Sequence, residues 1–140
     1  MTGKSRSTLF LIEKLIVILV FALCSVACVE IFVSAYIASN DAKDLNYALV
    51  AAKNGAERYK AYDADMSETA RSLGGVFSGA DEGAVVVFYD EGWLVSGEQD
   101  AVYSMRLRPV GGTSASACEL SISKVSGEEI LSFMVAAQGR

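Results

Sequence analysis

The feature that most constrains this chain is a long apolar stretch near its N-terminus, Leu9–Ala38. A helix needs about 20 mostly apolar residues to cross the hydrocarbon core of a bilayer. From Leu15 to Val29 the stretch carries no charged residue, and Leu9–Ile12 extends it towards the N-terminus. Charged residues are costly beside such a segment. Glu13 is therefore the most informative single residue of the sequence.

Charge is distributed unevenly along the 140 residues. The first 14 residues hold Lys4, Arg6 and Lys14 against one acid, whereas residues 41–140 hold 15 acidic and 9 basic residues, a net charge of −6. Basic flanks of a membrane span stay in the cytoplasm. The sequence therefore predicts a single-pass membrane protein with a cytoplasmic N-terminus and an extracytoplasmic acidic domain. Such a domain is not expected to bind nucleic acid.

Three interpretations of the apolar stretch are open. A cleaved signal peptide has an apolar region of about 7–15 residues, but here the apolar character continues beyond Cys28 to Ile37. A lipoprotein signal would use Cys28 as the acylated residue, although Ser25 stands where such signals prefer leucine. The third interpretation is a helix that the mature protein retains, and the residues that follow favour it.

Nothing in the sequence breaks a helix between the apolar stretch and residue 62. Proline is absent before Pro109, and glycine is absent between Lys4 and Asn54. After Ala38 the pattern becomes amphipathic, with apolar residues spaced by four, three, four and three. These residues, expected to face a domain core, are Leu45, Leu49, Ala52, Ala56 and Tyr59. We expect one helix from about Thr8 to Tyr62.

The remainder of the chain reads as a loop followed by a small antiparallel sheet. Residues 63–81 are polar and rich in glycine, with one short helix expected at Met66–Leu73. The period then changes to two, which is typical of strands. Four or five strands are expected, at 83–89, 93–96, 101–110, 118–125 and 130–135, with a turn at 90–92. The amphipathic half of the helix would cover one face of this sheet.

The composition does not favour catalysis or metal binding. The chain has no histidine, which removes histidine-based triads, histidine metal ligands and the commonest general base. No nucleophile and base pair is recognisable, so the chain is not expected to be an enzyme, and no cofactor or metal is expected. Cys24 and Cys28 lie one helical turn apart in the apolar stretch, and Cys118 is expected to face the core by strand alternation.

A long helix that is apolar in its first half, followed by a small antiparallel sheet, resembles the type IV pilins and the pseudopilins of type II secretion. The segment Leu9–Glu13, read as Leu-Phe-Leu-Ile-Glu, is similar to the motif of these proteins. Lys4 and Arg6 are similar to their short basic leader. The chain lacks the helix-kinking proline and the paired C-terminal cysteines of many major pilins. It therefore resembles a minor pilin or pseudopilin more than a bulk subunit of a fibre.

The resemblance implies an assembly role and a processing step. Glu13 would set the register between neighbouring subunits by pairing with a neighbour's N-terminal amine or with Lys14. The family's prepilin peptidase cuts after a glycine. The cut leaves the glutamate of the motif four residues after the new N-terminal residue. Aligned on Glu13, that cut falls between Thr8 and Leu9, and Thr8 replaces the glycine. The sequence leaves this cleavage open.

The sequence as a whole predicts an α+β protein with a pilin-like organisation. It divides into a basic leader at residues 1–8, a transmembrane or assembly helix at 9–38, an amphipathic continuation at 39–62, and a loop and antiparallel sheet domain at 63–140. The expected partners are the membrane, other pilin-like subunits and, if the leader is removed, a prepilin peptidase. The alternative is a single-pass membrane protein whose outer domain binds a partner or senses a ligand without polymerising.

Overall fold

The computed structural model describes residues 2–78, 83–111 and 116–137, and it has the expected α+β architecture. The chain forms two compact units, Met1–Ala42 and Lys43–Arg140, which are described in turn. The elements are the helices α1 (Thr2–Ala61) and α2 (Met66–Leu73), the strands β1 (Val76–Ser78), β2 (Ala84–Tyr89), β3 (Tyr103–Val110), β4 (Ser116–Lys124) and β5 (Glu129–Ala137), and a 3-10 turn at Glu98–Asp100.

Helix α1 is continuous, and it begins at Thr2 rather than at the expected Thr8. The leader contains no residue that ends a helix, and the Thr8 hydroxyl donates a hydrogen bond to the Lys4 carbonyl at 2.9 Å, within the helix. The other end is fixed by two residues with left-handed backbone, Asp63 (φ 47°) and Ala64 (φ 68°). The Ala64 amide donates to the Tyr59 carbonyl at 3.0 Å and closes the last turn.

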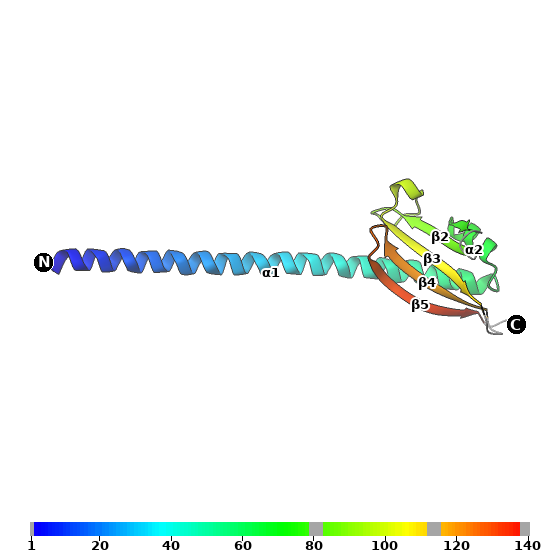
Figure 1. Cartoon of the computed structure of the whole chain (residues 1–140), viewed down its shortest axis with the longest axis horizontal. Coiled ribbons are helices and arrows are strands. Elements are labelled where there is room, and N and C mark those ends of the chain that lie inside the picture. The colour runs from blue at the N-terminus through cyan, green and yellow to red at the C-terminus, as the bar shows by residue number, and fades with distance from the viewer. Residues whose placement is uncertain (1, 79–82, 112–115, 138–140) are drawn as a thin grey trace. The chain divides into compact units, whose positions relative to one another are not determined.

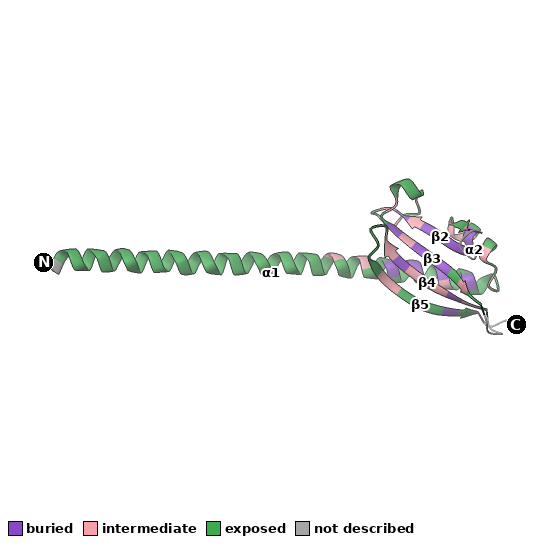
Figure 2. Cartoon of the chain, viewed as in Figure 1, coloured by how far each residue is buried: buried purple, intermediate pink, exposed green. Residues whose placement is uncertain are grey.

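The first unit presents apolar side chains on every side of the helix. The large hydrophobic residues from Leu9 to Ile37 keep between 49% and 75% of their surface exposed, as Figure 2 shows along this part of α1. Among the described residues, α1 is the one helix with the length and apolar composition to cross a membrane. A helix that is hydrophobic all round requires an apolar environment.

The second unit contains a five-stranded antiparallel sheet in the order β1-β2-β3-β4-β5 (Figure 1). Its register places apolar residues of neighbouring strands opposite one another, as for Met105 with Ile122 and Leu107 with Leu120. These four side chains are fully buried. The alternation predicted for residues 101–110 and 118–125 is therefore confirmed, and Cys118 is buried as expected.

One expected strand is absent, and one strand forms where a loop was expected. Residues 93–96 do not form a strand, because Trp93 has a left-handed backbone (φ 60°) that ends the extended conformation; only an isolated bridge joins Tyr89 to Val95. The additional strand is β1, which lies inside the segment expected to be a loop. Residues 79–81 of that expected loop lie outside the described residues.

The face of α1 that packs on the sheet differs from the expected one. Leu45 and Leu49 are 42% and 48% exposed, although the apolar spacing placed them towards the core. The buried face consists of small residues and one tyrosine: Ala48, Ala51, Ala52, Gly55 and Tyr59. A Cβ atom on Gly55 would lie 3.0 Å from the Met105 sulfur and 3.2 Å from Leu120 Cδ1. Close approach to the sheet therefore selects small residues.

Polar groups connect the helix to the sheet at Asp44. The Tyr103 hydroxyl donates a hydrogen bond to Asp44 Oδ1 at 2.9 Å. Lys124 Nζ lies 4.0 Å from Asp44 Oδ2 and 2.9 Å from Glu128 Oε2. Because Asp44 and Lys124 are only about a quarter exposed, these contacts are less screened than a surface ion pair.

Helix α2 carries clear signals at both ends. Asp65 accepts hydrogen bonds at its carboxylate from the amides of Ser67 (2.9 Å) and Glu68 (3.2 Å), as an N-cap residue does. A hydrogen bond from the Ser67 hydroxyl and, after it, these two amide hydrogen bonds lower the pKa of Asp65. At the other end Gly74 has a left-handed backbone (φ 68°), and the Gly75 amide donates to the Ala70 carbonyl at 2.9 Å. This arrangement is a Schellman motif.

The stability of the domain is expected to fall in alkaline solution. Burial raises the pKa of the Cys118 thiol from 9.0 to about 11, and burial also raises the pKa of Tyr59, Tyr89 and Tyr103. A group whose pKa is raised by folding makes its full contribution to the free energy of unfolding when the pH is below its pKa in the unfolded chain. That contribution is lost as the pH rises from 9.0 through about 11.

Urea unfolding of the full chain at a series of pH values tests this expectation. The free energy of unfolding should decrease most steeply in that interval, with Cys118 accounting for about 2–3 kcal/mol. A Cys118→Ala variant should show a shallower decrease, because the thiol no longer contributes. A stability independent of pH up to 11 would contradict the burial of these groups.

Candidate functional sites in the apolar helix and in a domain groove

All five residues singled out in the N-terminal motif lie on helix α1 and are exposed in the isolated chain. They are Lys4, Arg6, Thr8, Leu9 and Glu13. The Thr8–Leu9 peptide bond is inside the helix, since α1 begins at Thr2.

Glu13 has no partner among the residues that the structure describes. No hydrogen bond or ion pair involves its carboxylate there. Lys14, one candidate to neutralise Glu13, has its Nζ atom 5.2 Å from the ring centroid of Phe10 instead. Within one chain, the structure does not bring Lys14 and Glu13 together. The part of the chain that the structure describes therefore supplies no compensating charge for Glu13.

The three cysteines lie in two different environments. Cys24 and Cys28 are free, exposed and one turn apart on α1. Cys118 is free and fully buried in the sheet. In the described part of the chain, no group of three or more histidine, cysteine or acidic side chains comes together to hold a metal ion.

The second unit contains a groove with a volume of about 670 Å³ between α1, α2 and the turn after β2. Its walls carry several exposed apolar side chains, with Tyr47 at 52%, Val50 at 54%, Leu94 at 68% and Val95 at 52% of their surface. The volume falls within the range of ligand pockets, about 300–1,000 Å³. A cluster of exposed apolar residues around a concave surface is typical of an interaction site.

One wall of the groove depends on a strained tryptophan. A left-handed backbone costs a residue with a side chain about 1–2 kcal/mol, and Trp93 adopts it at φ 60°. Hydrogen bonds to Asp90 hold this turn. Its carboxylate accepts from the amides of Gly92 (2.9 Å) and Leu94 (3.0 Å), and its carbonyl accepts from Trp93 (3.0 Å). Strain that is maintained in this way is a feature of functional sites.

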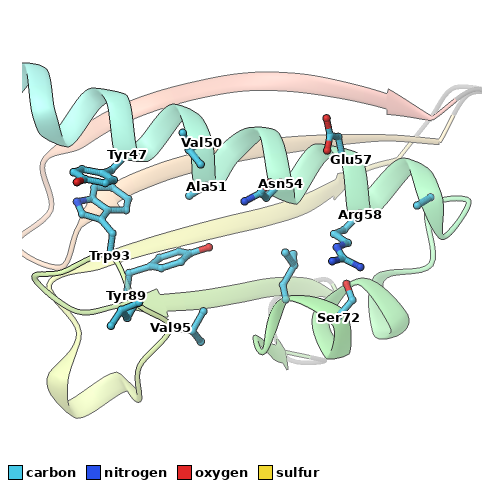
Figure 3. Close-up of a pocket in the computed structure, with 13 residues that line it drawn as sticks. Tyr47, Val50, Ala51, Asn54, Glu57, Arg58, Ser72, Tyr89, Trp93 and Val95 are labelled. Carbon is cyan, nitrogen blue, oxygen red and sulfur yellow. The ribbon is translucent and has the colours of Figure 1, made fainter.

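The strained turn places the Trp93 indole among three tyrosines. The indole stacks on Tyr103 with a centroid distance of 4.2 Å and on Tyr47 at 6.1 Å, and it contacts Tyr89 at 5.8 Å. The indole Nε1 is buried and has no acceptor among the described residues. The result is a rigid aromatic surface at one end of the groove (Figure 3).

The other end of the groove is polar. Arg58 points towards Ser72 of α2, and Asn54 lies between this end and the aromatic end (Figure 3). No hydrogen bond or ion pair of the described residues involves the side chain of Arg58 or Asn54. Glu57 points to the opposite side in Figure 3, and its carboxylate lies 3.9 Å from Lys53 Nζ. The guanidinium of Arg58 is thus the cation that the groove offers.

Comparison with protein-family models, with curated proteins and with solved structures gave no match to this chain. The candidate sites therefore rest on the residues themselves. Sequence reasoning located the helix motif but missed the groove, because its walls come from residues 47–61, 72–73 and 89–95, which are far apart in the sequence. The one available signal was Trp93, the single tryptophan of the chain, which directly follows a turn.

Proposed function

We propose that this chain is a structural subunit, of the minor pilin or pseudopilin kind, in a type IV pilus or a type II secretion-like filament. It would be held in the membrane by the apolar half of α1, with its N-terminus in the cytoplasm and its sheet domain outside. It would then join other pilin-like subunits through that helix. In this proposal the chain catalyses no reaction.

The observation that carries the proposal is a carboxylate without a partner on an apolar helix. Glu13 precedes a run of exposed apolar side chains that reaches Ile37, and the described residues offer it no counter-charge. An ionised carboxylate that is buried unpaired costs several kcal/mol, and a partner with good hydrogen-bond geometry offsets much of that cost. A neighbouring helix that supplies a positive charge at one stagger would therefore fix the register of assembly.

Replacement of Glu13 by glutamine should strongly weaken assembly and leave the domain folded. The variant keeps the size of the side chain and removes the charge that selects the register. We expect incorporation into sheared surface filaments, or co-purification with other pilin-like subunits, to decrease at least about tenfold, which corresponds to about 1.4 kcal/mol. Glu30→Gln is the matched control. Glu30 is an exposed acid of α1 that follows the uncharged segment Leu15–Val29, where we expect the outer membrane interface, and this variant should assemble normally.

The state of the N-terminus separates the proposal from its alternatives. N-terminal sequencing of the assembled protein should find Leu9 as the first residue if a prepilin peptidase removes the leader. A lipid on Cys28 would identify a lipoprotein instead. Equal incorporation of Glu13→Gln and the wild type would show that Glu13 does not set register. A wild-type chain that never enters filaments would favour a single-pass anchor that does not polymerise.

A further inference from the structure

We propose that the groove of the second unit binds an extended peptide segment of a partner protein, with an apolar side chain against Trp93 and a carboxylate at Arg58. This inference does not depend on filament assembly, because every lining residue lies within Lys43–Arg140. It assigns to the domain a binding role that the apolar helix cannot supply.

The length of the groove suits a short extended segment. Tyr47 and Arg58 lie on the same helix, and eleven residues of α-helix span about 16 Å. An extended peptide covers that distance in about five residues. A segment with its apolar side chain at the aromatic end would therefore carry its carboxylate about four residues further along.

Arg58 makes the polar end of the groove suited to an acidic group. Glu57 also lines the groove, but its carboxylate points to the opposite side (Figure 3), where it lies 3.9 Å from Lys53 Nζ. Residues 41–140 carry a net charge of −6, and yet the groove presents Arg58, which has no acidic partner among the described residues. The Ser72 hydroxyl beside it already donates to the Thr69 carbonyl at 2.9 Å. The donors for a bound carboxylate therefore come from the guanidinium, whose fork geometry matches a carboxylate.

Asn54 distinguishes a peptide from other ligands with an apolar body and a carboxylate. Its amide lies between the two ends of the groove (Figure 3) and makes no hydrogen bond within the described part of the chain. An asparagine amide offers one acceptor and two donors, which match a peptide group and not the alkyl chain of a fatty acid.

Fluorescence of Trp93 reports binding directly, because it is the single tryptophan of the chain. The full chain in lipid nanodiscs would be titrated with peptides of about five residues that begin with leucine or phenylalanine, end with glutamate or aspartate, and have glycine and serine between. We expect a saturable change in emission with a Kd on the order of 0.1 mM or tighter. Peptides that end with glutamine or asparagine should bind at least about tenfold more weakly.

Variants of exposed residues test the contacts without disturbing the fold. Arg58→Ala should weaken binding by about tenfold or more, and Asn54→Leu by a smaller factor. Lys60→Ala is the matched control, because Lys60 is an exposed cation of the same helix outside the groove, and it should bind like the wild type.

Three results would overturn the inference. The first is no emission change with any acidic peptide at concentrations up to about 5 mM. The second is equal affinity for the acidic and amide peptides. The third is saturable binding of octanoate or maltotriose without a response to the peptides, which would identify the groove as a site for a lipid acid or a sugar. None of these results bears on Glu13 or on filament assembly.

Discussion

Tyr59→Ala is expected to destabilise the sheet domain by about 3–5 kcal/mol, the range for truncating a large buried aromatic side chain. Tyr59 is 2% exposed and is among the largest fully buried side chains of the domain. It comes from α1 and lies in the same core cluster as Met105 and Leu120 of the sheet. Because a small domain has a total stability of about 5–15 kcal/mol, this single change would remove a large part of it.

Urea unfolding of the full chain, followed by Trp93 emission, measures the loss. Leu49→Ala is the informative comparison. It also shortens a large apolar side chain of α1, but Leu49 is 48% exposed. It should change the free energy of unfolding by less than about 1 kcal/mol. Tyr59→Phe should retain most of the stability because the ring remains. Equal losses for Tyr59→Ala and Leu49→Ala would mean that the helix packs by a different face.

The same comparison explains why the helix face was predicted incorrectly. Hydrophobic periodicity gives leucine more weight than alanine, so the pattern selected Leu45 and Leu49. The sheet instead admits Ala48, Ala51 and Gly55, because the backbone of α1 comes close to Met105 and Leu120. The space between α1 and the sheet depends on how the two elements pack together. The residues of the helix alone do not show how large that space is. At Ala52 and Tyr59 hydrophobicity and space agree, and there the prediction is correct.

The strands were predictable where one face is buried over several residues. Residues 103–110 and 116–124 alternate with a period of two, and their inward side chains form the core. Strand β1 has only three residues, which is too short for a period to appear. Residues 93–96 have the composition of a strand, but the hydrogen bonds of Asp90 and the left-handed backbone of Trp93 turn the chain away.

The two candidate sites also differ in how far the sequence predicts them. The motif that ends at Glu13 is a run of adjacent residues beside an apolar stretch, so its pattern is visible before any folding is considered. The groove exists only after the sheet brings the Trp93 turn beside α1 and α2. Arg58 and Asn54 look like ordinary solvent-facing residues of an amphipathic helix until that wall is in place.

Gly75→Ala is expected to destabilise the domain by about 2–3 kcal/mol, because the added methyl group has no space. A Cβ atom on Gly75 would lie 2.7 Å from Val87 Cγ2 and 2.8 Å from the Val86 carbonyl oxygen. The carbonyl belongs to the backbone of β2, so it cannot rotate away as the end of a flexible side chain can. The chain leaves α2 at this residue and enters β1. The substitution should therefore separate α2 from the sheet.

Gly97→Ala is the matched control for this second substitution. Gly97 has a φ of −76° and no atom within 4 Å of an added Cβ, so alanine should be neutral or stabilise by up to about 1 kcal/mol through the unfolded state. Urea unfolding of both variants gives the comparison. Equal stabilities would show that α2 does not approach β2 closely. A lower free energy of unfolding for Gly75→Ala alone would show that the stability of the domain depends on the close packing of α2. Ser72 and Leu73 of this helix form one wall of the groove.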